Sequence, residues 1–412
     1  MTHPNGIARR VPRLAPGRVG AAIRAAADNR STWPFLDGAR GVAIVAVFAF
    51  HALRLVGEWY SPKIRGAGVP EYLWVTGLAR FSIDMFFVLS GFLVATTWWA
   101  RRRRFERLGP ALADYARGRA LRILPVFWLS LLVLVPLRAP ELLSSGKDLL
   151  LLVTSQQYLD PDLPGRFNVV TWSLTVETHF YILLPLLALL VRRRASALLL
   201  LGASVGLTVW WFGARGDWPS SIILGRLDQF VVGMVVAALY QRHADGERPL
   251  LARLARARGA GFALAAVLVG VGVYHGKTLG LPHHHWFDAW QHPVAGLALG
   301  GLMLRLLCSE RRLGLRRVLE WRVFLVLGAL SYSLYLWHIP ILEWSLDHLS
   351  ANDALPVVGN ALAVTAAVVL TLAASAASYA LVEVPFMRRK RRASQAPSSQ
   401  PPREPLPVPA GP

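Results

Sequence analysis

Long apolar stretches recur along the whole chain, separated by short polar segments. A bilayer core about 30 Å thick needs about 20 mostly apolar residues per helix. Ten stretches fit that requirement, near residues 40–57, 81–100, 120–138, 171–191, 196–213, 223–241, 259–275, 290–308, 322–343 and 357–382. The pattern predicts an all-α fold, a polytopic transmembrane helical bundle of about ten helices.

The composition supports a membrane protein and removes a competing interpretation of the charge. The chain is 54% hydrophobic and only 17% charged, whereas soluble domains are about a quarter charged. Its net charge of +21 would by itself suggest a nucleic-acid partner. However, most Lys and Arg residues fall in alternate segments, at 1–40, 101–122, 192–194, 242–258, 305–322 and 388–403. This positive-inside pattern predicts that both termini are cytoplasmic and that the partner is a lipid bilayer, not nucleic acid.

One membrane domain accounts for nearly all of the sequence. Residues 1–32 are predicted to be a cytoplasmic, disordered basic N-terminus without the apolar core of a signal peptide. Residues 33–390 are predicted to form the membrane domain, and residues 391–412 a disordered, Pro-rich tail. A single cysteine, Cys308, excludes an internal disulfide, a Cys-ligated zinc site and an iron–sulfur cluster.

Ionisable side chains within the predicted spans are the candidates for chemistry, because each costs about 2.5–3.5 kcal/mol at the centre of a membrane helix. The first span carries Arg40 and His51, eleven positions apart. A rise of about 1.5 Å per residue separates them by about 16 Å. Arg40 is then expected at the cytoplasmic mouth and His51 near mid-membrane. They could be an anion-binding Arg and a buried proton acceptor, or a snorkelling Arg and a histidine bonded to a backbone carbonyl.

Two carboxylates lie near the predicted outer ends of spans two and four. Asp84 occurs in RFSIDMFFVLSGFL and Glu177 in TWSLTVETHFY. Either could orient a histidine or accept a proton from a hydroxyl substrate, and either could be a solvated acid at a helix end. His179, two residues beyond Glu177, faces another side of its helix.

A pair of arginines begins the third span, in DYARGRALRILPVFW. Arg119 and Arg122 are three positions apart and therefore share one helix face. Paired guanidinium groups match the oxygens of phosphate. Plain positive-inside anchoring is the alternative, and it is the interpretation we adopt for Arg101–Arg104.

Other polar residues carry weaker signals. Arg226 and Asp228 begin span six, two positions apart and not expected to pair. His338 in SYSLYLWHIP is either catalytic or an interfacial structural residue. A loop before the eighth span holds six further candidate metal ligands: His275, His283, His284, His285, Asp288 and His292. Adjacent histidines do not present one face to a metal, so we predict a solvated loop and no metal site. No phosphate-binding loop, nucleophile elbow or dinucleotide fingerprint is present.

Seven blocks of the sequence resemble, in order, the acyltransferase 3 family of integral membrane O-acyltransferases, over about residues 33–390. They are FLDGARGVAIVAVFAFH, IDMFFVLSGFLVA, RGRALRILPVFWL, TWSLTVETHFYILLPLL, GRLDQFVVGMVVAAL, LGALSYSLYLWHIPIL and SYALVEVPFMRR. The resemblance implies transfer of an acyl group, often acetyl, from cytoplasmic acyl-CoA to a hydroxyl of a sugar or other glycosylated acceptor. It implies no permanently bound cofactor and a multi-pass location in a bacterial-type inner membrane.

The resemblance also implies residue roles. The family's Arg-x10-His motif falls on Arg40 and His51, and its Arg-x-x-Arg motif on Arg119 and Arg122. The acid of its WSL-x-VE block falls on Glu177. The block usually continues with a second acid or amide, whereas here Thr178 and His179 follow. The further helix and extracytoplasmic hydrolase-like domain of some members are expected to be absent.

These observations lead to a mechanistic hypothesis. Arg40, Arg119 and Arg122 would bind the acyl-CoA phosphates, and His51 would act as general base on the acceptor hydroxyl or form an acyl-histidine intermediate. Glu177 or Asp84 would orient the imidazole or the acceptor. A transporter or exporter of a glycan or lipid, and a non-catalytic membrane scaffold, are the rival functions. The acceptor, the acyl chain length and the oligomeric state stay open.

Overall fold

The computed structural model describes residues 17–28, 31–64, 79, 81–160, 163–191, 193–215, 223–247, 250–257, 259–278, 289–309, 314–350 and 356–395. Regular structure in these ranges is helical and includes no strand, which confirms the all-α prediction. A backbone in lipid must satisfy its hydrogen bonds internally, and a helix does so within one segment.

Each of the ten predicted spans overlaps a helix. The α-helices of the first half are α1 (Arg18–Asp28), α2 (Pro34–Ile64), α4 (Ser82–Arg104), α5 (Leu108–Arg138), α6 (Gly146–Val153), α7 (Leu163–Phe167), α8 (Trp172–Leu190) and α9 (Arg194–Arg215). Those of the second half are α10 (Leu227–Ala244), α11 (Leu250–Arg256), α12 (Ala260–Thr278), α14 (Gln291–Cys308), α15 (Gly314–Leu319), α16 (Arg322–Leu349), α17 (Pro356–Ser378) and α18 (Val384–Gln395). Short 3₁₀ segments are η2 (Pro140–Ser144), η3 (Gln157–Leu159), η4 (Val169–Thr171) and η6 (Ile223–Gly225), and η7 (Tyr379–Glu383) is a π-helical turn.

Seven of the described helices are long and apolar enough to cross a membrane, or eight if the bent pair α11 and α12 forms one span. Two predicted spans correspond to α10 and α14, which have only 18 residues each. At about 1.5 Å per residue, 18 residues extend about 27 Å. Both helices are largely buried by their neighbours. The chain is therefore a multi-pass helical membrane protein, while the count of ten and the side of the termini stay predictions.

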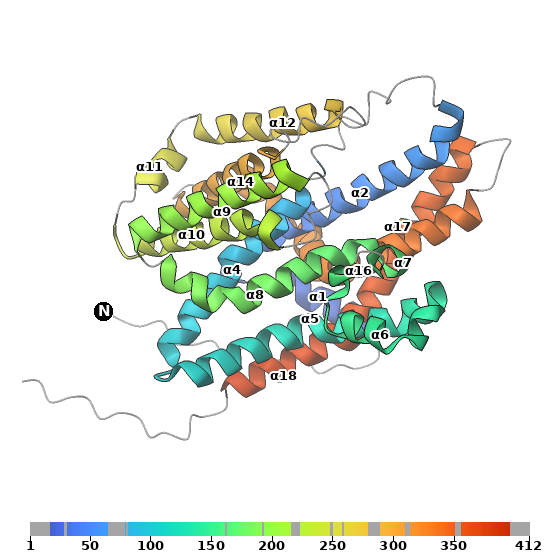
Figure 1. Cartoon of the computed structure of the whole chain (residues 1–412), viewed down its shortest axis with the longest axis horizontal. Coiled ribbons are helices and arrows are strands. Elements are labelled where there is room, and N and C mark those ends of the chain that lie inside the picture. Colours follow the sequence, from blue (N-terminus) through green and yellow to red (C-terminus); the bar gives the residue numbers. More distant parts are fainter. Residues whose placement is uncertain are drawn as a thin grey trace, which may run out of the picture.

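The helices form two groups that meet at α4. In one group α16 packs against α2 and α17, and in the other α10 packs against α4, α9 and α14. α4 also contacts α2 and α8, so it joins the two groups. Figure 1 shows α11 and α12 at one edge of the bundle and α5 with α18 at the opposite edge. The candidate functional site lies where α2, α4, α8 and α16 converge.

Glycines let α2 and α16 approach closely. A methyl group at Gly328 would overlap the backbone oxygen of Asp37, and one at Gly41 would overlap that of Phe324. Small residues at such crossings allow membrane helices to pack backbone against backbone. This contact fixes the position of α2, and hence of Arg40 and His51, relative to α16.

Gly328→Ala is therefore expected to destabilise the folded protein. Overpacking of a tight contact costs about 1–3 kcal/mol, because the added methyl must separate α2 from α16. The measurement is the thermal unfolding midpoint in detergent, which should fall. Gly206→Ala on α9 is the matched control, since an added methyl there has no atom within 4 Å. Equal midpoints for the two variants would contradict this close packing.

The ends of the chain are more ordered than predicted where the structure describes them. Residues 18–28, expected to be disordered, form α1, whose Ala22 and Ala26 are buried in a cluster with Leu330 and Leu334. The Ala-rich sequence explains this difference, because alanine favours helix and its small side chain permits close packing. At the other end α18 continues to Gln395, and residues 396–412 lie outside the described residues.

Candidate functional site

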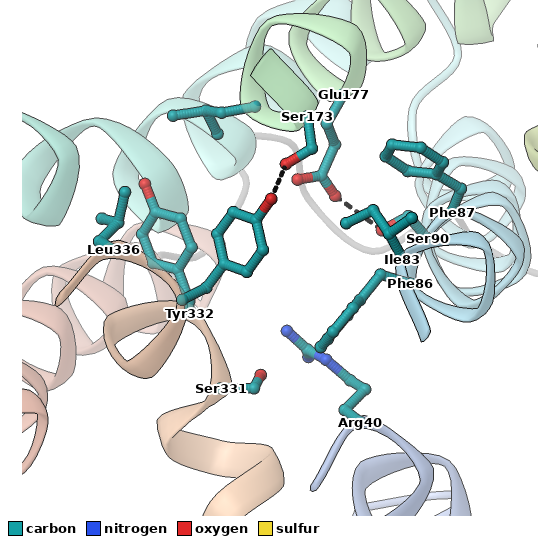
Figure 2. A pocket seen from close by; sticks show the side chains of 12 residues that line it. Arg40, Ile83, Phe86, Phe87, Ser90, Ser173, Glu177, Ser331, Tyr332 and Leu336 are labelled. Carbon is teal, nitrogen blue, oxygen red and sulfur yellow. Dashed lines mark hydrogen bonds between the residues drawn. The ribbon is translucent and has the colours of Figure 1, made fainter. Parts of the chain in front are cut away.

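A small pocket lies at the junction of four helices. Its volume is about 70 Å³. Its polar lining comes from α2, α4, α8 and α16, and consists of Arg40, Ser90, Ser173, Glu177, Ser331, Tyr332 and Tyr335. Figure 2 shows the Arg40 guanidinium and the Glu177 carboxylate pointing into this space. Two sequence-predicted residues, 137 positions apart, are thus brought to one pocket.

Hydroxyl groups hold the Glu177 carboxylate in place. Ser90 Oγ of α4 donates a hydrogen bond of 2.6 Å to Glu177 Oε1, and the Tyr181 hydroxyl donates to the same oxygen. Charge-assisted hydrogen bonds of this kind are stronger than neutral ones. Glu177 is therefore a fixed acceptor inside the bundle, and the alternative of a solvated acid at a helix end is wrong.

A second hydrogen-bonded chain begins at Ser173, one helical turn before Glu177 on α8. Ser173 Oγ donates to Tyr335 Oη at 2.8 Å (Figure 2). Tyr335 Oη in turn donates to the backbone oxygen of Val170 at 2.8 Å. These bonds join α16 to the start of α8. Ser331, on the same face of α16, has a buried Oγ without a hydrogen-bond partner among the described residues. The pocket thus offers this hydroxyl to a ligand.

The two arginines of α5 take different partners. Arg122 Nη1 lies 3.1 Å from Glu383 Oε1, and Ser333 Oγ donates to Glu383 Oε2 at 3.3 Å. The Arg119 guanidinium lies over the ring of Tyr181, 5.6 Å from its centroid. Arg119 is therefore linked to Glu177 through Tyr181. Arg40 is in electrostatic range of Arg122, Glu177 and Glu383. Of the three predicted arginines Arg40 lines the pocket, whereas Arg119 and Arg122 are not lining residues.

Sequence reasoning missed Glu383. This fully buried acid occurs in the block SYALVEVPFMRR and lies in η7, the π-helical turn between α17 and α18. Such turns are frequent at functional sites. The sequence signal that could have identified Glu383 is an acid beside a long apolar run, because such an acid is costly in lipid without a cationic partner.

His51 lies against another histidine. The centroid of the His51 ring is 5.2 Å from that of the His338 ring. The centroid of the His338 ring is in turn 5.6 Å from that of the Tyr335 ring. Tyr335 lines the pocket, so these two contacts connect His51 to it, although His51 is not a lining residue. His51 forms no hydrogen bond with a described residue and contacts neither Glu177 nor Asp84. The sequence predicts that Glu177 or Asp84 orients the His51 ring, but neither carboxylate contacts that ring in this conformation.

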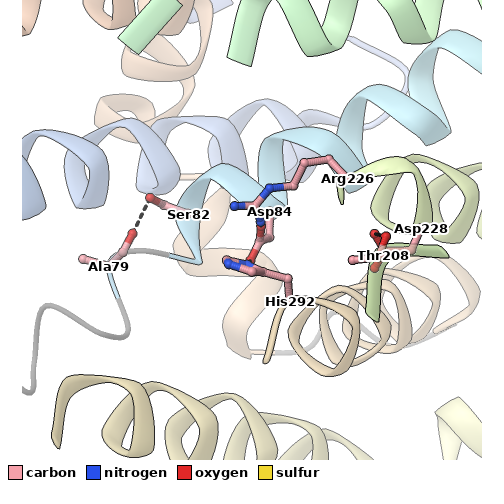
Figure 3. A network of polar contacts seen from close by, with 7 residues as sticks. All are labelled: Ala79, Ser82, Asp84, Thr208, Arg226, Asp228 and His292. Atoms are coloured by element: carbon pink, nitrogen blue, oxygen red, sulfur yellow. Dashed lines mark hydrogen bonds and ion pairs between the residues drawn. The ribbon is translucent and has the colours of Figure 1, made fainter. Parts of the chain in front are cut away.

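Asp84 belongs to a separate buried network. Arg226 Nη1 donates to Asp84 Oδ1 at 3.0 Å, and His292 Nδ1 lies 2.8 Å from Asp84 Oδ2 (Figure 3). Asp84 and Arg226 are 0% and 2% exposed, which corrects the alternative of a solvated acid. Arg226 also lies between the rings of Trp172 and Phe212, 5.5 and 5.4 Å from their centroids.

Asp228 and His292 are buried polar residues as well. Asp228 accepts a hydrogen bond of 2.9 Å from Thr208, so Arg226 and Asp228 have different principal partners, as predicted. His292 was predicted in a solvated loop, but it is buried at the start of α14 because Asp84 offers it a hydrogen bond. The side chains of the other predicted loop ligands lie outside the described residues. No group of three or more candidate metal ligands occurs among those described.

A comparison with known families decides the identity of the chain. The model of the acyltransferase 3 family, described as an acyltransferase domain, matches residues 33–380. The chain belongs to this family. It is an O-acyltransferase, and as such it requires an acyl donor and a hydroxyl-bearing acceptor.

Curated relatives support the same class. Acyltransferase MdmB of Streptomyces mycarofaciens is 26% identical to this acyltransferase over 346 residues, which cover 76% of this chain and 79% of MdmB. The O-acetyltransferase OatA of Staphylococcus aureus is 22% identical over 382 residues, which cover 86% of this chain but 57% of OatA. No solved structure matches the acyltransferase.

Proposed function

We propose that this acyltransferase moves an acetyl group from cytoplasmic acyl-CoA to a hydroxyl of a carbohydrate or other glycosylated acceptor, in a bacterial-type inner membrane. The observation that carries the proposal is the presence of Arg40 and Glu177 in one pocket. Arg122 is in electrostatic range of Arg40, and Arg119 lies over the ring of Tyr181, whose hydroxyl donates to Glu177. Acyl-CoA is large and anionic, and guanidinium groups match phosphate oxygens. The likeness to an enzyme named as an O-acetyltransferase supports the acetyl group.

The separation of Arg40 and His51 along α2 suits a donor whose phosphates and thioester lie at opposite ends of the molecule. His51 lies eleven positions after Arg40, about 16 Å along the helix, a distance that the flexible pantetheine arm can span. An apolar cavity of about 150 Å³ holds benzene, so the pocket of about 70 Å³ suits a thin arm with a short acyl group. The small volume of the pocket favours acetyl over a long acyl chain.

His51 is the proposed general base. One of its ring nitrogens takes the proton of the acceptor hydroxyl, and the hydroxyl oxygen attacks the thioester carbonyl carbon. The new C–O bond forms, the C–S bond breaks, and the departing thiolate receives the proton from His51. The products are an ester and free CoA. General acid–base catalysis of this kind contributes about 10²–10⁴-fold in rate.

Labelled acetyl-CoA tests the reaction. The full-length protein is purified into nanodiscs and incubated with radiolabelled acetyl-CoA and membrane extracts that contain candidate acceptors. The proposal predicts donor-dependent labelling of an acceptor, whose identity mass spectrometry of glycans and small molecules reveals. Absence of both acceptor labelling and acetyl-CoA hydrolysis with folded protein would reject the proposed donor and acyl group.

Arg40→Gln is expected to raise the KM for acetyl-CoA by about 10- to 100-fold, because a hydrogen bond to a charged group contributes about 1.5–3 kcal/mol. Initial rates at varied acetyl-CoA concentration measure it. The matched control is Arg138→Gln, since Arg138 is at the far end of α5 in an ion pair with Glu343. An unchanged KM in Arg40→Gln would argue against a role for Arg40 in donor binding.

A further inference from the structure

The contact between His51 and His338 joins two helices at a fixed place. His51 lies on α2 and His338 on α16, with ring centroids 5.2 Å apart and ring planes inclined by 52°. His338 is 1% exposed, and the glycine contacts between α2 and α16 hold the two helices together. At this centroid separation a side-chain rotation can bring one nitrogen of each ring within hydrogen-bond distance of the other.

The backbone assigns the tautomer of His338. Its Nδ1 lies 2.8 Å from the carbonyl oxygen of Tyr335 on the same helix. A carbonyl oxygen only accepts, so Nδ1 carries the hydrogen and Nε2 of the neutral ring is left with a lone pair. His338 Nε2 is buried and has no hydrogen-bond partner among the described residues. A buried acceptor without a partner is costly and calls for an explanation.

The carboxylates near the site are engaged elsewhere. Glu177 accepts from Ser90 and Tyr181, and Asp84 accepts from Arg226. In catalytic triads a third group holds the hydrogen of the base and so fixes its tautomer. His338 Nε2 belongs to a ring that contacts the His51 ring, and its lone pair is available for this task among the described residues.

We propose that His338 is the positioning residue for His51, accepting a hydrogen bond from one His51 nitrogen through Nε2 so that the other nitrogen is held as the proton acceptor. The hydrogen of this bond stays on His51. When His51 takes the proton of the acceptor hydroxyl, its ring becomes an imidazolium that His338 stabilises, and that proton then passes to the thiolate of CoA. This inference rests on the proposed function, because it assigns His51 the role of base.

Two variants of His338 separate positioning from packing. His338→Leu removes the acceptor atom but keeps an apolar side chain, whereas His338→Gln retains an amide oxygen able to accept near the position of Nε2. We expect His338→Leu to lower kcat at least tenfold with an unchanged KM for acetyl-CoA. His338→Gln should restore much of that loss. Both are assayed in nanodiscs after size-exclusion chromatography and thermal unfolding have established the folded fraction.

The pH profile of kcat/KM gives a readout that a packing role would not change. The rate should fall toward acidic pH as His51 becomes protonated. In His338→Leu the acidic limb should move to lower pH, because the neutral His338 ring that accepts from His51 no longer stabilises the protonated His51 ring. A move to higher pH would mean that His338 disfavours the protonated His51 ring, and would reject the positioning role. The other groups that act on His51 among the described residues are Arg54 on α2 and His338 itself, and Arg54 is unchanged in both variants.

The possible results are distinguishable. If His338→Leu has wild-type kcat and a wild-type pH profile while His51→Ala is inactive, the positioning role is rejected and the proposed function stands. Equal losses in folded His338→Leu and His338→Gln, with an unshifted profile, would also reject it. If wild-type protein transfers no acetyl group at all, the proposed function itself fails.

Discussion

His51→Ala is expected to lower the rate of acyl transfer by about 10²–10⁴-fold, the range that a general base contributes. His51 forms no hydrogen bond with a described residue, so its removal leaves no buried partner unsatisfied and the protein should stay folded. The measurement is the initial rate of acetyl transfer from labelled acetyl-CoA in nanodiscs, normalised to folded protein. A wild-type rate in this variant would show that His51 is not the base.

A second histidine provides the matched control. His348→Ala removes the same ring from the exposed end of α16, where Nδ1 lies 2.9 Å from the backbone oxygen of Trp344. The rate of His348→Ala should stay within about twofold of wild type, because surface substitutions have small effects.

Incubation of the wild-type protein with labelled acetyl-CoA and no acceptor distinguishes direct transfer from an acyl-histidine intermediate. Label retained on His51 indicates an acyl-histidine intermediate, and its absence indicates direct transfer.

The helical architecture could be predicted from the sequence because it depends on local pattern. Apolar length specifies a membrane helix, and each predicted span overlaps a described helix. The fixed rise of a helix also predicted that Arg40 and His51 share one helix at different depths. The number of spans does not follow from apolar pattern alone, since α10 and α14 are short and covered by neighbours.

Pairings between distant residues could not be predicted. Asp84 and His292 are 208 positions apart, and Arg122 and Glu383 are 261 apart. The energy of such a pair depends on how the helices pack, which no local periodicity specifies. The sequence did identify Asp84, Arg122 and His338 as unusual, because polar residues in apolar spans need compensation. It could not indicate which partner compensates each one.

The same cost of buried charge makes Asp84→Ala the largest expected stability change. The Asp84 carboxylate faces Arg226 at 3.0 Å and His292 at 2.8 Å, and all three side chains are buried (Figure 3). Removal of one partner of a buried ion pair costs about 3–5 kcal/mol, since the other charge stays in a medium of low dielectric. Thermal unfolding in detergent should therefore show a marked loss. Glu141→Ala, in an exposed pair with Arg166, should cost at most about 1 kcal/mol.

A double variant decides whether Asp84 acts through this ion pair. Asp84→Leu combined with Arg226→Met removes both charges and keeps the apolar volume. This double variant should recover much of the stability lost in Asp84→Ala, because an apolar replacement of a buried ion pair is often neutral or stabilising. The rate per folded molecule should recover with it if Asp84 has a structural role. If Asp84→Ala instead remains as stable as wild type but loses acyl transfer, and the stable double variant is equally inactive, the carboxylate acts in catalysis. The network of Asp84, Arg226 and His292 is separate from the pocket of Glu177, and this favours the structural outcome.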